Sequence, residues 1–241
     1  LLQLKMKKNI LILGASSEIG LATTRLFLKN KWDVYAHYNK SKKKLEKIQS
    51  ENQMLHLLKC NFENLSEANK FIKKIYKKKI CSLVNLASYM DNKSYKESDS
   101  ASLIKALKVN TIIPIQIQKK LLPFMIKVNF GRILNVSSIG VKFGGGEFTY
   151  NYSFSKQALE YIPSYLRNLT NKNILTNVLR VGVLNIKRGK KIKEKNMSKR
   201  IKLIPIKRAA KSNEVAETIF NLSSEKNTYI ANEKITIAGG E

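Results

Sequence analysis

Cysteine and histidine are scarce in this sequence, and their scarcity limits its chemistry. Among 241 residues, the two cysteines are Cys60 and Cys81, and the two histidines are His37 and His56. Both cysteines stand in strand-like segments, which argues against a disulfide scaffold. So few thiols and imidazoles provide no cluster of metal ligands. The sequence therefore predicts no metal site and argues against a zinc mechanism.

Long apolar runs are also missing from the chain. No stretch approaches the ~20 consecutive apolar residues that a membrane-spanning helix needs. Residues 1–8 lack the apolar segment of a signal peptide. We therefore expect a cytoplasmic protein that does not associate with a membrane.

Acidic residues are few, so the chain carries a large net positive charge, which bears on its possible partners. Asp and Glu number 17 against 45 Lys and Arg, which gives a net charge of +28. A field of this sign attracts polyanions, so a nucleic-acid-binding protein is a rival hypothesis. Arginine, the preferred reader of phosphates and guanines, occurs only at positions 25, 132, 167, 180, 188, 200 and 208. Because the other cations are lysines scattered along the chain, we favour a solvated basic surface and expect no specific nucleic-acid partner.

The chain opens with a strand, a glycine turn and a helix. Asn9–Leu13 is a short continuous apolar run of the kind that is buried on both faces in a parallel sheet. It leads into Gly14–Gly20, and apolar residues at helical spacing follow over Leu21–Asn30. In such a unit the helix N-terminus offers unpaired N–H groups to a pyrophosphate. We therefore expect a dinucleotide-binding site at this turn.

The second predicted strand, residues 33–39, ends without a carboxylate. NAD-selective sites usually place an acid here to hold the ribose 2′-hydroxyl, but this chain continues with Tyr38, Asn39 and Lys40. Lys40, Ser41 and the lysine after them could instead bind a 2′-phosphate. This favours NADP(H) over NAD(H), the alternative being that these lysines belong only to the general basic surface.

Strands and helices alternate through the rest of the chain. Predicted strands cover 54–58, 81–88, 131–138, 174–183 and 234–238, and predicted helices cover 65–79, 103–122, 152–170 and 214–223. This alternation predicts an α/β fold with a doubly wound parallel sheet, a Rossmann-type three-layer α/β/α sandwich, in a single domain over residues 1–241. Pro114 should kink its helix near Asn110 and free a backbone carbonyl, which makes Asn110 a candidate functional residue.

Tyr152 and Lys156 lie one helical turn apart and hence on one helix face. A nearby ammonium favours the phenolate and lowers the pKa of the phenol from its usual value of ~10. The hydroxyl then becomes usable for proton transfer near neutral pH. Taken alone, the spacing also fits an ordinary pair on a helix surface.

In their order along the chain, these motifs resemble the short-chain dehydrogenase/reductase family over essentially the whole length. The resemblance rests on Gly14–Gly20, Val84–Ser88, Val109–Asn110, Asn135–Ser138, Tyr152–Lys156, Arg180–Gly182 and the stretch from Ile204 to Gly240. It implies an NAD(P)-dependent oxidoreductase acting on CH–OH or C=O groups. By this resemblance, Tyr152 exchanges a proton with the carbonyl, and Lys156 lowers the pKa of the phenol and binds the nicotinamide ribose. Ser138 would hold the carbonyl oxygen, and Asn110 would support a water beside Lys156.

The resemblance also assigns the residues around the coenzyme. They are Gly14, Ser16, Ser17, Ile19, Gly20, Tyr38, Asn39, Lys40, Ser41, Asn61, Phe62, Asn85, Ala87, Tyr152, Lys156, Val181, Gly182 and Leu184. Some positions depart from the family pattern. Val181 replaces a proline, and Ile186 stands where a threonine commonly touches the carboxamide, so nicotinamide binding is expected to be weaker or differently arranged. Ser137 is an alternative to Ser138. We favour Ser138 because the spacing from Ser137 to Tyr152 is longer than usual.

A basic substrate lid is expected at about residues 186–200, where lysine dominates. Its charge would suit an anionic substrate, such as a carrier-linked acyl chain, a coenzyme A ester or a nucleotide-linked sugar, unless it only reflects the general lysine excess. In appearance the chain comes nearest to the 3-oxoacyl-(acyl-carrier-protein) reductases. The resemblance thus implies reduction of a 3-oxoacyl thioester, with acyl carrier protein as a partner. A sugar or small alcohol substrate is the alternative, and a non-catalytic nucleotide-binding protein is disfavoured by the complete catalytic set.

Assembly is a further expectation from the resemblance. Members of the family commonly form dimers or tetramers through two helices. The corresponding segments here, 116–124 and 158–169, are apolar enough to associate. We therefore expect a homo-oligomer, with a tetramer favoured over a dimer.

Overall fold

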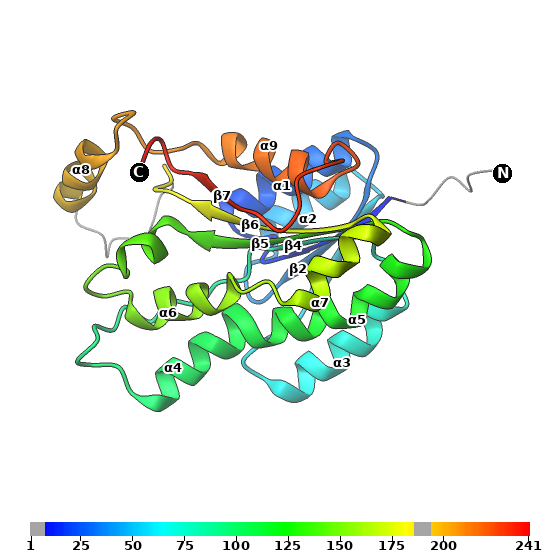
Figure 1. The fold of residues 1–241 in the computed structure, drawn as a ribbon, viewed down its shortest axis with the longest axis horizontal. Helices are drawn as coiled ribbons and strands as arrows, with labels where there is room; N and C mark the ends of the chain where they lie inside the picture. Colours follow the sequence, from blue (N-terminus) through cyan, green and yellow to red (C-terminus); the bar gives the residue numbers. More distant parts are fainter. Residues whose placement is uncertain (1–7, 186–193) are drawn as a thin grey trace.

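Seven parallel strands form one sheet at the centre of the molecule (Figure 1). The computed structural model describes residues 8–185 and 194–241. The strands are β1 (Asn9–Leu13), β2 (Asp33–Tyr38), β3 (Leu55–Lys59), β4 (Ser82–Asn85), β5 (Gly131–Ser138), β6 (Ile174–Val181) and β7 (Lys234–Ile237). Their order across the sheet is β3-β2-β1-β4-β5-β6-β7. The chain therefore winds outward from β1 in one direction and from β4 in the other, which confirms the predicted doubly wound fold.

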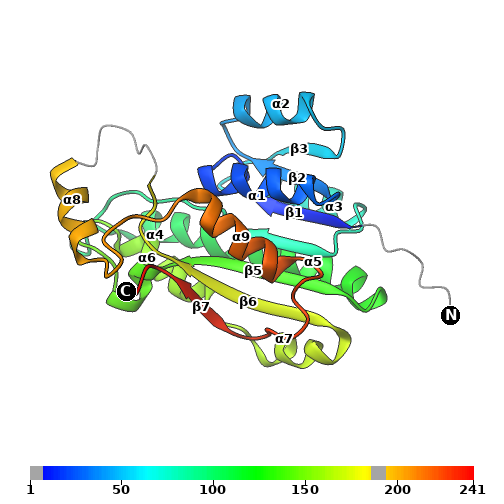
Figure 2. The same cartoon turned by 90° about the horizontal axis from the view of Figure 1, so that it is seen from above.

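Helices cover both faces of this sheet, giving the three predicted layers (Figures 1 and 2). One face carries α1 (Glu18–Lys29), α2 (Lys43–Ser50) and α9 (Ser212–Ser223). The other carries α3 (Leu65–Tyr76), α4 (Ser100–Leu107), α5 (Ile113–Lys127), α6 (Tyr150–Leu159) and α7 (Ser164–Asn168). The remaining described α-helix, α8 (Glu194–Leu203), stands apart from both layers near the ends of β6 and β7.

The alternation of side chains along β1 divides the apolar interior into two cores. Ile10 and Ile12 join the core beneath α1 and α9, whereas Leu11 and Leu13 join the core beneath α3 and α5. Because both faces of the strand are covered, all five of its residues are buried. This explains why the strand is a continuous apolar run instead of an alternating one.

The predicted helix over 103–122 is interrupted. A π-helical segment, Lys108–Ile112, separates α4 from α5, and Pro114 lies in the first turn of α5. The backbone is already helical before Pro114, so the missing N–H group removes a hydrogen bond from a continuing helix, and the pattern shifts to π at this point. The irregularity near Asn110 is thus present, as a π segment and not as a simple kink.

The predicted helix over 152–170 is also wrong in its extent. It ends as α6 at Leu159, and the short α7 begins only after Pro163. Proline disfavours helical backbone in the preceding residue and lacks an N–H group, so one helix cannot run through this point. The sequence also missed α2, whose few apolar residues include the buried Leu45 and Ile48.

Two absences hold for the described residues. No helix in residues 8–185 or 194–241 combines the length and apolar character that crossing a bilayer requires. Within the same ranges, no three Cys, His, Asp or Glu side chains are grouped so that they could hold a metal ion.

Candidate active site

The predicted site residues gather at the carboxyl ends of the parallel strands. Gly14 follows β1, Asn39 follows β2 and Asn61 follows β3 on one half of this edge. Ala87 follows β4 and Ser138 ends β5 on the other half. The strand order reverses between β1 and β4, and open α/β sheets bind ligands at such a switch point.

The glycine turn brings the start of α1 close to the end of β4. Gly14 has φ +75°, and a Cβ there would lie 2.7 Å from the carbonyl oxygen of Leu86. Ser17 is the N-cap of α1, and its Oγ accepts a hydrogen bond from the Gly20 N–H at 3.1 Å. At Gly20 a Cβ would lie 2.6 Å from the Ala15 oxygen, so both glycines permit close backbone packing. Glu18, which replaces a common glycine, begins the helix and pairs at the surface with Lys44.

His37 fastens this turn to the neighbouring strands. The Gly14 N–H donates to His37 Nδ1 at 3.2 Å, so Nε2 carries the proton and donates to the Cys60 carbonyl at 3.0 Å. The ring also stacks on Phe62, with the centroids 4.2 Å apart. Burial lowers the pKa of His37 to about 4. The imidazole is therefore neutral at physiological pH and acts as a fixed bridge between three strand ends.

A cavity of about 270 Å³ opens beside this turn. The predicted coenzyme residues that line it are Gly14, Ser16, Ser17, Asn39, Ser41, Asn61, Phe62 and Ala87. Residues that the sequence analysis did not select also line it: His37, Cys60, Glu63, Leu86, Ser88, Tyr89 and Val109. Most of these residues are direct chain neighbours of the selected ones. Their position at the end of a strand was therefore the signal by which the sequence could have identified them.

Several predicted coenzyme residues lie elsewhere. Tyr38 packs against the apolar core, and Val181 belongs to that core. Asn85 is buried and accepts a hydrogen bond from the Ala87 N–H at 3.2 Å, so it shapes the wall of the cavity from behind. Lys40 is exposed at the surface and does not line the cavity. Ile19 is the second residue of α1, and its side chain is buried.

A second cavity, of about 310 Å³, adjoins the first at Ser88, which lines both. Ser138 and Tyr152 line this second cavity together. Gly182 and Leu184, both predicted coenzyme residues, lie on its opposite wall after β6. The candidate proton donor and the candidate carbonyl-binding serine therefore line the same cavity, which shares Ser88 with the first cavity.

Lys156 approaches this space from inside the protein. Its side chain is fully buried, and Nζ donates to the carbonyl oxygens of Val136 at 2.9 Å and Ala87 at 3.1 Å. Nζ lies 5.9 Å from the centre of the Tyr152 ring. Burial lowers the pKa of Lys156 to about 8. The ammonium is thus the charged form at neutral pH, and it is positioned to act on the phenol.

Asn110 lies in the π segment and organises the wall between the two cavities. Its Oδ1 accepts from the Tyr89 N–H at 2.6 Å, while Nδ2 donates to the Tyr89 carbonyl and to Ser155 Oγ. Both amide protons are therefore engaged by the protein, and the side chain is fully buried. Asn110 joins the loop after β4 to α6, the helix that carries Tyr152 and Lys156.

The two neighbouring serines at the end of β5 have different surroundings. Ser138 lies in the second cavity, and its Oγ accepts from the Gly140 N–H at 3.2 Å. Ser137 points into the protein, where its Oγ donates to Glu160 Oε1 at 2.7 Å. This placement agrees with the preference for Ser138, because only that hydroxyl lines the cavity shared with Tyr152.

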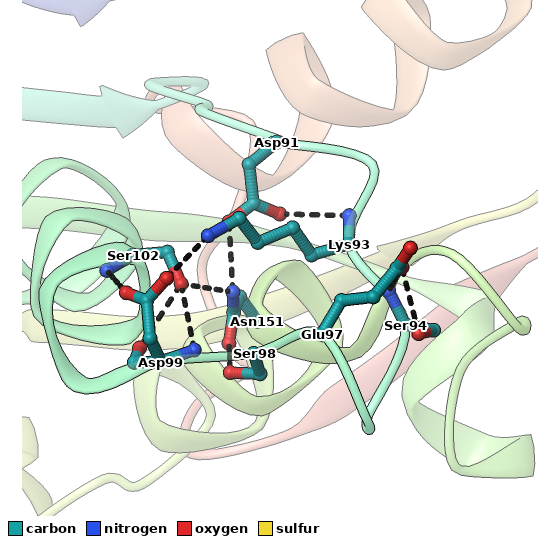
Figure 3. A network of polar contacts seen from close by, with 8 residues as sticks. All are labelled: Asp91, Lys93, Ser94, Glu97, Ser98, Asp99, Ser102 and Asn151. Atoms are coloured by element: carbon teal, nitrogen blue, oxygen red, sulfur yellow. Dashed lines mark hydrogen bonds and ion pairs between the residues drawn. The ribbon is translucent and has the colours of Figure 1, made fainter.

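The loop between β4 and α4 forms a wall of the second cavity and is held by buried polar contacts (Figure 3). Asn151, the residue before Tyr152, is fully buried. Its Oδ1 accepts from Ser98 Oγ at 2.6 Å, and its Nδ2 donates to Asp91 Oδ2 at 2.7 Å and to Ser102 Oγ at 3.1 Å. The start of α6 and this loop are therefore positioned by the same amide.

The same loop is also tied to the start of α4 (Figure 3). Asp99 caps α4 by accepting from the Ser102 N–H at 2.7 Å, and Lys93 donates to its other oxygen at 2.5 Å. These bonds hold the pKa of Asp99 at about 2. The loop thus has a defined conformation from Asp91 to Ser102.

Part of the predicted lid lies outside the described residues, namely Ile186 and the segment to 193. The rest forms α8, from which Met197 and Arg200 line the second cavity. Arg200 also pairs with Glu241. A cation and an apolar side chain from α8 therefore stand at the edge of the cavity that contains Tyr152.

Comparison with known proteins agrees with this geometry. A family model described as enoyl-(acyl carrier protein) reductase, which belongs to the short-chain dehydrogenase/reductases, matches residues 14–241. The 3-oxoacyl-(acyl-carrier-protein) reductase FabG of Thermotoga maritima is 29% identical over 242 residues, covering 97% of each chain. The enzyme of the same name from Aquifex aeolicus is 30% identical over 188 residues, covering 77% of this chain and 75% of its own.

Solved structures share the fold. A 3-oxoacyl (acyl-carrier-protein) reductase of Agrobacterium tumefaciens C58 with NADP bound superposes with a TM-score of 0.86 at 20% identity, covering 97% of this chain and 94% of its own. ElxO with NADP bound gives a TM-score of 0.83 at 26% identity and covers 98% of both chains. With strand ends, glycine turn and cavities arranged as above, this chain belongs to the short-chain dehydrogenase/reductase family and is an NAD(P)-dependent oxidoreductase acting on a carbonyl or hydroxyl group.

Proposed function

We propose that this enzyme uses NADPH to reduce a ketone, namely that of a 3-oxoacyl thioester, with Tyr152 as the proton donor. One observation carries the proposal: Tyr152 and Ser138 line one cavity, and the buried Lys156 ammonium lies 5.9 Å from the tyrosine ring. Ser88 lines both that cavity and the one beside the glycine turn. A carbonyl and a coenzyme would thus meet beside the phenol.

The first cavity fits a dinucleotide. A Cβ at Gly14 would clash with Leu86, so glycine keeps the turn close to the β4 end and the cavity open. The N–H groups of Glu18 and Ile19, at the start of α1, precede the first intrahelical bond and are the natural partners of a pyrophosphate. Asn61 and Phe62 would border the adenine, and Lys156 and Ala87 would border the nicotinamide ribose.

The preference for NADPH over NADH rests on the end of β2. No carboxylate follows this strand before Glu46, and Asn39 and Ser41 line the cavity there. Lys42 pairs with Glu46 at 2.9 Å, and we assign the exposed Lys40, between Asn39 and Ser41, to a 2′-phosphate. Relatives of this fold bind NADP, as in the Agrobacterium enzyme and ElxO. Replacement of Lys40 by Glu should weaken NADPH binding and leave NADH binding unchanged; equal losses for both would contradict the preference.

The chain's own residues then have separate tasks. When bound, the coenzyme would supply a hydride for the carbonyl carbon. Ser138 Oγ holds the carbonyl oxygen, and the Tyr152 hydroxyl gives its proton to that oxygen as negative charge develops. Lys156 stabilises the phenolate that remains, because its ammonium is buried beside it with little solvent screening. Asn110 keeps Tyr89 and α6 in place, so that serine and tyrosine converge on one oxygen atom.

Two observations support the proposed substrate class: the names of the relatives and the lining of the second cavity. The matching curated proteins are named 3-oxoacyl-(acyl-carrier-protein) reductases, whereas the family model carries the name of an enoyl reductase. Met90, Ile139 and Met197 give the cavity an apolar wall suited to an acyl chain. We favour the ketone because Ser138 and Tyr152 together bind and protonate a carbonyl oxygen.

The test is NADPH oxidation with a 3-oxoacyl thioester, with an enoyl thioester and keto-sugars measured in parallel. We expect turnover with the 3-oxoacyl thioester and a loss of about 10²- to 10⁴-fold in kcat for Tyr152→Phe, the range expected for removing a general acid. Tyr150→Phe is the matched control, since Tyr150 lies on the same helix and packs against Tyr95. Unchanged turnover in Tyr152→Phe would contradict the mechanism, and turnover with only the other substrates would contradict the substrate class.

The proposal includes a cytoplasmic location, acyl carrier protein as partner and a homotetramer. The apolar groove between α5 and the α6–α7 region supports self-association, because Tyr161 and Tyr165 are exposed there beside Leu122 and Ile126. A single-chain mass by light scattering would contradict the oligomer.

A further inference from the structure

A buried carboxylate lies behind the candidate catalytic residues and takes no part in the mechanism above. Glu160 follows the last residue of α6 and is completely buried. Its Oε1 accepts from Ser137 Oγ at 2.7 Å and from Arg180 Nε at 2.9 Å, and its Oε2 accepts from Arg180 Nη2 at 2.5 Å. Lys234 Nζ lies 3.9 Å from Oε2. A charge buried this deeply is tolerated only because several donors converge on it.

These donors come from three adjacent strands. Ser137 of β5 and Arg180 of β6 are direct partners across the parallel ladder, and Lys234 belongs to β7. Glu160 is the only member of the cluster that comes from the α6 region. The carboxylate therefore fastens the end of α6 to the sheet at the strand position next to Ser138.

Lys156 makes a second attachment of the same helix to the same strand, through the carbonyl of Val136. Lys156 and Glu160 are four residues apart and bind successive residues of β5, Val136 and Ser137. Two attachments one turn apart fix both the height and the rotation of the helix over the strand. The position of Tyr152 relative to Ser138 is then determined.

We infer that Glu160, through Ser137 and Arg180, is a positioning residue that holds Tyr152 in register with Ser138 for proton transfer. The inference rests on the proposed function, because register matters only if both side chains act on one carbonyl oxygen. Glu160 and Ser137 touch neither cavity, so they contribute through geometry alone. Small errors in the placement of reacting groups are costly, and a shift of about 1 Å can reduce a rate by about 10².

The test compares two deletions of a buried hydroxyl. Ser137→Ala removes the bond to Glu160, and Ser82→Ala removes an equally short bond of 2.7 Å to the Ser223 carbonyl at the opposite end of β4. Urea unfolding of both variants measures the stability that each one loses, so that a loss of stability can be separated from a loss of rate. We expect kcat to fall about tenfold in Ser137→Ala only, with KM and the Kd for NADPH unchanged in both. Ser137→Thr, which keeps the hydroxyl, should recover most of the rate.

Equal kcat values in Ser137→Ala and Ser82→Ala would overturn the inference, as would parallel changes of kcat and KM in both. Hydrogen exchange without substrate provides an arm that does not depend on turnover. Amides of Tyr150–Leu159 should exchange faster in Ser137→Ala than in Ser82→Ala. If the wild-type enzyme shows no turnover with any ketone, the proposed function fails, and this exchange comparison alone decides whether Glu160 fixes the helix.

Discussion

Lys156 carries a buried ammonium group, whose burial costs free energy and whose charge is central to the proposed proton transfer. Burying an ammonium disfavours its charged form, and here burial lowers its pKa to about 8 from 10.5. Two backbone carbonyls compensate part of that cost by accepting hydrogen bonds. The ammonium therefore keeps its charge at neutral pH and loses it at a pH slightly above neutral. The activity should then change with pH in a range that is easy to measure.

For ketone reduction we expect kcat/KM to be constant near neutrality and to fall above about pH 8, as Lys156 loses its proton and stops stabilising the Tyr152 phenolate. The observed midpoint belongs to the coupled Tyr152–Lys156 pair. A pH series of kcat/KM with NADPH measures it. Lys156→Met should have a much lower rate without this descending limb; the same limb in that variant would assign it to another group.

His37 gives a prediction for stability. Its pKa falls from 6.5 to about 4 on folding, so between these values the unfolded chain binds a proton that the folded chain does not. Stability is therefore lost as pH falls through this window, by about 3 kcal/mol in total. Urea unfolding at a series of pH values measures the loss. His37→Gln should show a smaller difference between pH ~7 and pH ~4 than the wild type, and an identical difference would show that other groups are responsible.

At the scale of elements, the candidate active site is assembled by contacts between a loop and a helix. The loop after β4 supplies Ser88 and Met90 to the second cavity, while α6 supplies Tyr152. Asn110 fixes this loop at Tyr89, and Asn151 fixes it at Asp91 and Ser98 (Figure 3). The wall of the cavity thus depends on two buried amides.

Replacing Asn151 by Ala should therefore affect substrate binding as well as stability. The change leaves the partners Asp91, Ser98 and Ser102 without the amide, at a cost of roughly 1–3 kcal/mol. We expect KM for the thioester to rise severalfold while the Kd for NADPH stays constant. Asn177→Ala is the control, since Asn177 is equally buried and bonds to Ile230 and Glu233 away from both cavities. A comparable increase of KM in Asn177→Ala would show that general destabilisation causes the effect.

At the scale of the whole molecule, the main feature is its charge of +28. The ion pairs described above use few of these cations, and most of the lysines that the structure describes lie on the surface. Such a field raises the encounter rate with an acidic partner and is screened within ~8 Å at physiological ionic strength. The charge therefore concerns association and not the fold.

Salt should consequently separate a carrier-bound substrate from a small one. Between about 50 and about 300 mM salt, we expect kcat/KM to fall roughly tenfold for a substrate attached to acyl carrier protein. For the same acyl group on a short uncharged thiol, the change should stay within about twofold. Equal salt dependence for the two substrates would mean that the basic surface has no part in recognising the carrier.

The sequence by itself determined the order of strands and helices, the glycine turn and the spacing of Tyr152 and Lys156, because these depend on local patterns of apolar and small residues. It also placed an irregularity near Asn110. Only the tertiary structure decided that Ser137 turns inward to Glu160 and that His37 bridges three strands. These two features join residues more than 20 positions apart, and their energies come from burial and long-range hydrogen bonds that no local pattern encodes.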